Sequence, residues 1–139
     1  MTSCNAIIGA IISTLSADAN LSGVEFLKEF PAVRRDTPLK KVAVSVGVDK
    51  LKVQLAEEKL KLSAGAAPTT VRAKLTLCAP KTFTGQTCYG IIHNIVKGLG
   101  VMAANYNITG VETGELKYSS ALGLLVLPIT VTFSVGHAF

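Results

Sequence analysis

Apolar residues follow two different spacings along this chain, and the change between them constrains the fold most strongly. They recur at every second position over residues 42–48, 69–78 and 124–135, which is the period of a β-strand with one buried face. They recur at every third or fourth position over residues 8–19 and 88–99, which is the period of an amphipathic helix. With 139 residues, the chain has the length of a single α+β domain.

The first helix is predicted from an apolar stripe near the N-terminus. The stripe consists of Ile8, Ile11, Ile12, Leu15 and Ala19. No Lys or Arg precedes this stretch, and a secretory signal normally begins with a basic segment. We therefore interpret it as a helix of the domain. Residues 18–23 are expected either to end this helix or to form a break before a short helix over residues 24–29, and Pro31 closes that segment.

The central part of the chain is predicted to contain two strands joined by a loop. The first strand shows Val42, Val44, Val46 and Val48 on one face, and the apolar phase changes after Asp49. Such a change indicates either a bulge or a turn within residues 48–56. A mobile loop is expected over residues 56–68. The second strand follows over 69–78, before Pro80, and its outward side chains are Arg72, Lys74 and Thr76.

The second half of the chain predicts a helix and two further strands. Thr84 is a suitable N-cap for the helix over 85–99, and Gly98 and Gly100 are expected to end it. A strand is expected over 105–111. Thr113 and Gly114 are expected to give a kink or a bulge, after which residues 115–118 continue the strand. Pro128 cannot donate to a ladder, so the last strand is at an edge there or carries a bulge. The predicted order is α-β-β-α-β-β in a mainly antiparallel or mixed sheet with helices packed on it.

Composition excludes several classes of protein. No apolar run reaches the roughly 18 to 20 residues that a membrane span needs. Three cysteines without a paired spacing predict neither a disulfide framework nor a zinc ribbon. Lys28, Arg34, Arg35, Lys40 and Lys41 lie among acidic residues with few aromatics nearby, which favours a solvated loop over a nucleic-acid patch. Charged residues make up only 17% of the chain, so a partner is expected to cover part of its surface.

No constellation with catalytic or ligand spacing is found. Glu112 and Glu115 are three residues apart in a predicted strand and should face opposite sides. The glycine-rich run over residues 98–103 follows a helix, whereas a dinucleotide-binding fingerprint follows a strand. His93 and Cys88 are separated by about 140° around a helix. We expect no enzyme activity and no catalytic, cofactor-binding or metal-binding residues.

The order of these signals from Leu39 onward resembles the phage tail terminator (tail completion) proteins of the lambda type, as in Gram-positive prophages and contractile tail-like particles. The sharpest features are the proline that precedes a helix beginning with glycine, and the Gly-Glu pair before Tyr118. The segments that carry the resemblance are Val42–Gly47, Lys74–Pro80, Gly85–Ile92 and Ile108–Glu115.

The resemblance implies a structural protein of a virion tail or tail-like particle, assembled in the cytoplasm of the host bacterium. Such proteins form a homohexameric ring on the tail tube, which ends tail elongation and offers a surface for head or collar attachment. The implied partners are the tube protein, the tail sheath and the head–tail connector or collar. Nucleic acid is implied only as DNA passing through the ring. The outward residues Arg72, Lys74, Thr130 and Thr132 are the candidate subunit contacts, and the loop 56–68 is the candidate for ordering on assembly.

Two alternatives stay open at the level of sequence. The first is a tail-tube or head–tail connector ring subunit, because residues 39–63 could form the long hairpin that tube subunits carry. The second is a small α+β ligand-binding or enzyme domain, which would be a monomer or dimer with a polar-lined pocket.

Overall fold

A computed structural model describes residues 4–28, 41–53, 66–120 and 123–138 of the chain. Within these residues, two α-helices and one 3-10 helix accompany a mixed sheet of six strands. The predicted α+β fold is therefore confirmed. In chain order the elements are α1 (Cys4–Ser16), η1 (Ala19–Leu21), β1 (Glu25–Lys28), β2 (Ala43–Val53), β3 (Ala66–Pro80), α2 (Gly85–Met102), β4 (Ile108–Thr113), β5 (Lys117–Ser119) and β6 (Leu124–Ala138).

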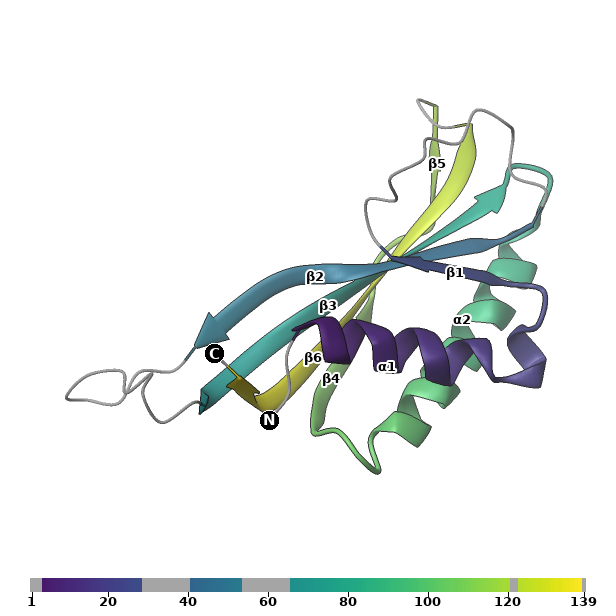
Figure 1. Ribbon diagram of the computed structural model, residues 1–139. Helices are drawn as coiled ribbons and strands as arrows, with labels where there is room; N and C mark the ends of the chain where they lie inside the picture. The colour runs from purple at the N-terminus through teal and green to yellow at the C-terminus, as the bar shows by residue number, and fades with distance from the viewer. Residues whose placement is uncertain (1–3, 29–40, 54–65, 121–122, 139) are drawn as a thin grey trace.

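The sheet is mainly antiparallel, with strand order β1-β2-β3-β6-β4. Only β1 and β2 run parallel, and β5 pairs with the part of β6 that β4 leaves unpaired. Figure 1 shows both helices on one side of the sheet, and β2, β3 and β6 running on beyond the helices. Among the described elements, one face of the sheet is thus covered by helices and the other is not.

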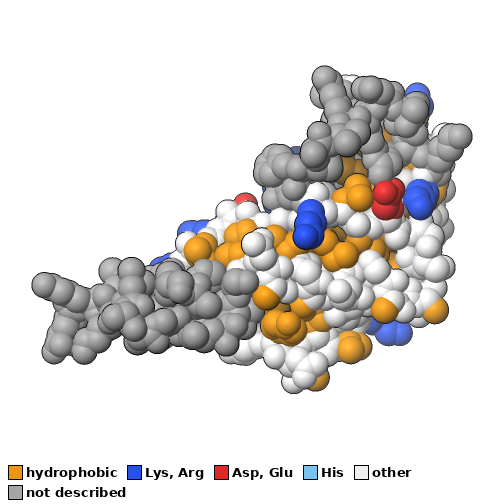
Figure 2. Space-filling model, viewed as in Figure 1, with side chains coloured by type: hydrophobic (Ala, Val, Ile, Leu, Met, Phe, Trp, Pro, Cys, Tyr) orange, Lys and Arg blue, Asp and Glu red, His pale blue; other side chains and the backbone are white. Residues whose placement is uncertain are grey.

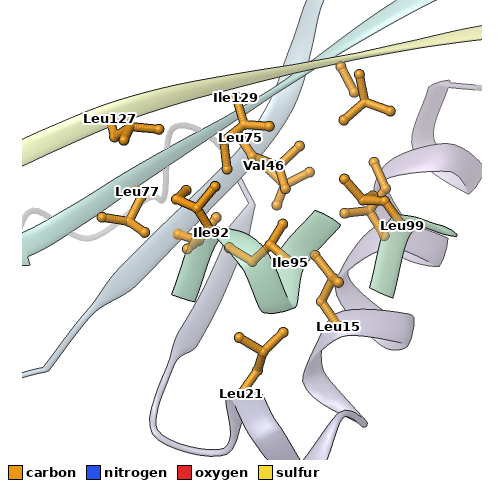
Figure 3. Packing of buried hydrophobic residues seen from close by; sticks show 14 of the residues in the cluster. Leu15, Leu21, Val46, Leu75, Leu77, Ile92, Ile95, Leu99, Leu127 and Ile129 are labelled. Atoms are coloured by element: carbon orange, nitrogen blue, oxygen red, sulfur yellow. The ribbon is translucent and has the colours of Figure 1, made fainter. Parts of the chain in front are cut away.

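The hydrophobic core fills the space between the helices and the covered face of the sheet (Figure 3). The long strands β3 and β6 contribute every second residue, as the alternating sequence predicts. The fully buried residues of β3 and β6 are Val71, Ala73, Leu75, Leu77, Ala79, Leu127, Ile129, Val131 and Phe133. Their partners on the helices are Ile7, Ile11, Leu15, Cys88, Ile95 and Leu99.

The first helix differs in detail from the predicted stripe. Ile7, Ile11 and Leu15 are the buried residues of α1, whereas Ile8 and Ile12 are half-buried. The helix ends at Ser16, so Ala19 lies beyond it in η1 and is exposed. The core side of α1 is therefore a narrower stripe at steps of four residues.

The second helix is longer than predicted. Thr84 is its N-cap, as expected, and the Thr87 backbone N–H donates to the Thr84 hydroxyl oxygen at 3.2 Å. The prediction that Gly98 and Gly100 end the helix is wrong, because α2 continues to Met102. Gly98 has a packing role instead: a Cβ atom there would lie 2.5 Å from Leu15 Cδ2, so the missing side chain lets α1 and α2 approach closely.

The short helix predicted over residues 24–29 is wrong, since Glu25–Lys28 form strand β1. Glu25 pairs with Ala43 and Lys28 pairs with Val46, parallel to β2. A helical turn of this length is only marginally stable by itself. Beside β2, the same residues gain ladder hydrogen bonds, and Phe26 packs against the core.

The open choice between a bulge and a turn after Val48 is decided in favour of a bulge. The register shifts between Val48 and Lys50, and β2 continues to Val53. The loop predicted over 56–68 is wrong at its end, because residues 66–68 belong to β3. Its remaining residues, 56–65, lie outside the described part of the chain.

Pro128, which has no backbone N–H to donate, lies within the last strand, β6. Pro128 is not at an edge, because β6 lies between β3 and the pair β4 and β5. Its carbonyl accepts from the Gly114 N–H at 2.8 Å, and the N and C=O of one strand residue point to the same neighbour. The missing donor therefore faces the interruption between β4 and β5 at Gly114. The register of β3 with β6 has no shift at Pro128, so neither the edge nor the bulge alternative holds for the last strand.

Candidate functional site

The four predicted contact residues lie together in the structure. Arg72 pairs with Thr132, and Lys74 pairs with Thr130, in the antiparallel register of β3 and β6. Directly opposed residues of a sheet have Cβ atoms about 4.5–5.5 Å apart. The four side chains thus form one block, two from each strand, although about 60 residues separate the two pairs in sequence.

This block lies on the face of the sheet that no described helix covers. Arg72 and Lys74 alternate with the fully buried Val71, Ala73 and Leu75, so they point away from the helices. Both are exposed, and the two threonines are half-buried. We call this side the open face. It is defined by the four block residues and by their register neighbours Gly47, Lys50, Lys52, Thr70, Gly110, Glu112 and Ser134.

Two lysines of β2 extend the block and were not among the predicted residues. Lys50 pairs with Arg72, and Lys52 pairs with Thr70. Both are exposed. Without the bulge at Asp49, the alternation of β2 would point Lys50 and Lys52 toward the helix side; the bulge moves them to the open face. The phase change in the sequence was the available signal, but a turn would have explained it equally well.

An ion pair joins the bulge to the block. The Arg72 Nε donates to Asp49 Oδ2 at 2.8 Å, and the two side chains are 44% and 35% exposed. A pair this exposed contributes at most about 1 kcal/mol to stability. The Asp49 carboxylate also offsets the repulsion between Arg72 and the directly opposed Lys50, since like charges facing each other across a sheet are destabilising.

Large apolar side chains reach the surface elsewhere. Three of them are on α2, and the others are on β2, β4 and β5. They are Leu51, Tyr89, Val96, Val101, Val111 and Tyr118. Val96 belongs to the apolar pattern of residues 88–99 but is 39% exposed. In the view of Figure 2, hydrophobic atoms also reach the surface at several places and charged side chains are few.

The residues that could have carried chemistry are dispersed. Glu112 is an exposed residue of β4, and Glu115 follows that strand and lies 3.8 Å from the Lys117 ammonium. His93 is exposed whereas Cys88 is buried, on the same helix. The glycine-rich run at 98–103 lies within the last turns of α2 and its C-cap. Within the described ranges, no three His, Cys, Asp or Glu side chains are grouped so that they could hold a metal ion.

The cysteines of the described residues are free thiols. Burial raises the pKa of the Cys78 and Cys88 thiols above their ordinary value of 9.0, because a thiolate is poorly solvated in an apolar environment. Both are therefore neutral at physiological pH. Neither described helix is long and apolar enough to cross a membrane.

No protein-family model matches the chain, and no curated protein matches it.

Proposed function

We propose that this protein is a tail terminator: a subunit of a homohexameric ring that caps the tail tube of a phage or tail-like particle and ends its elongation. The proposal rests on the resemblance of residues 42–118 to that family. The structural observation that carries it is the inequality of the two sheet edges. The parallel strand β1 forms one edge, and β4 with β5 forms the other.

A closed ring requires contacts of a particular kind. Each subunit must present two different surfaces, one to each neighbour, because the same surface on both sides gives a twofold dimer. A sheet with two unlike edges provides such surfaces. The exposed apolar residues Val111 and Tyr118 lie at the β4–β5 edge, and apolar side chains at a subunit contact gain from their removal from water.

The second face of the ring would carry out the capping. One side docks on the last tube ring, and the other differs enough not to receive another tube subunit. The partners in this proposal are the tube protein, the tail sheath and the head–tail connector or collar, in a particle assembled in the host cytoplasm. No catalytic step is required, because the ring acts by shape.

A tail-tube or connector subunit is the second candidate. The observation that favours it is the long antiparallel pair of β2 and β3, whose register extends from Ala43 and Cys78 to Val53 and Thr69. Tube subunits use a long hairpin to build an inner barrel. A tube subunit should polymerise into long cylinders by itself, whereas a terminator should not.

The test is association with preformed tubes. The purified protein is mixed with polymerised tube subunits, and the tube ends are imaged by electron microscopy. We expect a single ring at tube ends and no further growth when more tube subunits are added. Cylinders formed by this protein alone would identify a tube subunit. A stable monomer that never associates with tubes would contradict the proposal.

A further inference from the structure

The open face carries a row of positive charge that the sequence does not display. Lys52, Lys50, Arg72 and Lys74 come from two strands and occupy three successive levels of the β2–β3 register, at Thr70, Arg72 and Lys74. All four are exposed. At about 3.4 Å per strand residue, the row is about 14 Å long. We call these four residues the cationic row.

The residues around the cationic row are glycines, hydroxyl-bearing Thr and Ser residues and one acidic residue, Glu112. On the open face they are Thr70, Thr130, Thr132, Ser134, Gly47, Gly110 and Glu112. None of them is a large apolar or aromatic residue. A protein partner of specific fit would require a core of apolar or aromatic anchors, which this part of the face lacks. Lys, Arg and Thr are instead the side chains that bind phosphate oxygens of nucleic acids.

The charge density of the row matches a nucleic-acid strand. Duplex DNA carries one phosphate per about 3.4 Å of axis on each strand, so a length of about 14 Å presents about four phosphates. Four cations therefore face a similar number of anions. Asp49 and Glu112 together reduce the charge of the open face by two. The bond of Asp49 to Arg72 uses only Nε, and a guanidinium has five N–H donors, so Arg72 can still bind a phosphate.

We propose that the cationic row binds the phosphate backbone of duplex DNA without sequence preference. Its lack of aromatic side chains leaves no platform for stacking on bases. The bulge in β2 has a function in this account, since it brings Lys50 and Lys52 onto the face of Arg72 and Lys74. Arg72 and Lys74 are thereby assigned to DNA rather than to a neighbouring subunit. The position of the row against DNA passing through a ring rests on the proposed function, whereas the binding itself does not.

The test uses the full-length protein and a fluorescent duplex of mixed sequence, with anisotropy measured from about 50 to 200 mM salt. The slope of log affinity against log salt should be about −3 to −4 for about four phosphate contacts. The variant Lys50→Gln/Lys52→Gln should bind about tenfold or more weakly at low salt and lose about two units of slope. Both lysines are exposed, so the thermal unfolding of the variant should be unchanged.

The matched control removes the same net charge elsewhere. Lys81 and Lys97 are exposed and lie outside the row, after β3 and on α2, and Lys81→Gln/Lys97→Gln should retain the full slope. Asp49→Asn should bind DNA a few-fold more tightly, because it removes the anion beside Arg72. Equal losses in both double variants, or no binding at 50 mM salt, would overturn the proposal. Tighter binding of polyglutamate than of DNA would also overturn it and indicate an acidic protein partner.

Failure of the cationic row to bind DNA and failure of the protein to cap tubes give different results. A protein that caps tubes but does not bind DNA would retain the terminator role and lose the cationic row as a DNA site. A protein that binds DNA through the row but ignores tubes would do the reverse. Capping by Lys50→Gln/Lys52→Gln should be normal, since the row does not contact the tube in this account.

Discussion

Gly98 lies at the contact between the two helices, where the space for a side chain is already filled by Leu15. A Cβ atom at position 98 would lie 2.5 Å from Leu15 Cδ2, and Leu15 is fully buried. Gly90 belongs to the same helix, but a Cβ atom added at Gly90 would meet no neighbouring atom within 4 Å. Two glycines of one helix therefore differ only in what surrounds them.

The Gly98→Ala variant should be less stable than Gly90→Ala by about 1–3 kcal/mol. Both gain the same helix propensity, about 1 kcal/mol for alanine over glycine. Only Gly98→Ala is overpacked, at the cost usual for a well-packed core. Urea unfolding of the two variants measures the difference directly. Equal stabilities would mean that α1 and α2 do not approach as closely as described.

The side-chain directions of the strands could be predicted from the sequence, because the strand period is two and one face is buried. Arg72, Lys74, Thr130 and Thr132 are all on the open face, as their alternation with apolar residues indicates. Their pairing could not be predicted. It depends on the register of β3 with β6, which is a long-range property that no local pattern fixes.

At the scale of elements, the start of α2 shows how one side chain defines a boundary. The Thr84 hydroxyl accepts from the Thr87 N–H at 3.2 Å, which satisfies one of the donors left free at a helix start. Replacing Thr84 with alanine should destabilise the protein by about 1 kcal/mol, whereas Thr84→Ser should retain most of the stability. Thermal unfolding distinguishes them. A serine variant as unstable as the alanine variant would rule out the capping role.

The elements that the sequence failed to predict are those held by neighbours rather than by their own pattern. Strand β1 is four residues long and exists because β2 offers it a parallel edge. Likewise, the face of the sheet on which each of residues 48–53 lies depends on whether β2 continues beyond the phase change. A turn and a bulge both reverse the apolar phase, and only the pairing with β3 distinguishes them.

At the scale of the whole molecule, the proposed role depends on surfaces that the described residues leave uncovered. The helices cover one face of the sheet, the two edges are unlike, and apolar side chains remain exposed on α2, β4 and β5. In the proposed ring on a tube, the two edges would meet neighbouring subunits, and the cationic row on the uncovered face would lie against DNA. The fold class was predictable from periodicity, but this division of surfaces needed the three-dimensional arrangement.

The most direct test of the terminator role is the length of the tails made without this protein. The gene is deleted from the producing strain, and tail lengths are measured by electron microscopy beside a complemented strain. We expect tube polymers that are longer and more variable than in the complemented strain, because nothing ends their growth. Absent tails would indicate a tube subunit, and complete tails without heads would indicate a connector. Tails of normal length and fully assembled particles would contradict the account.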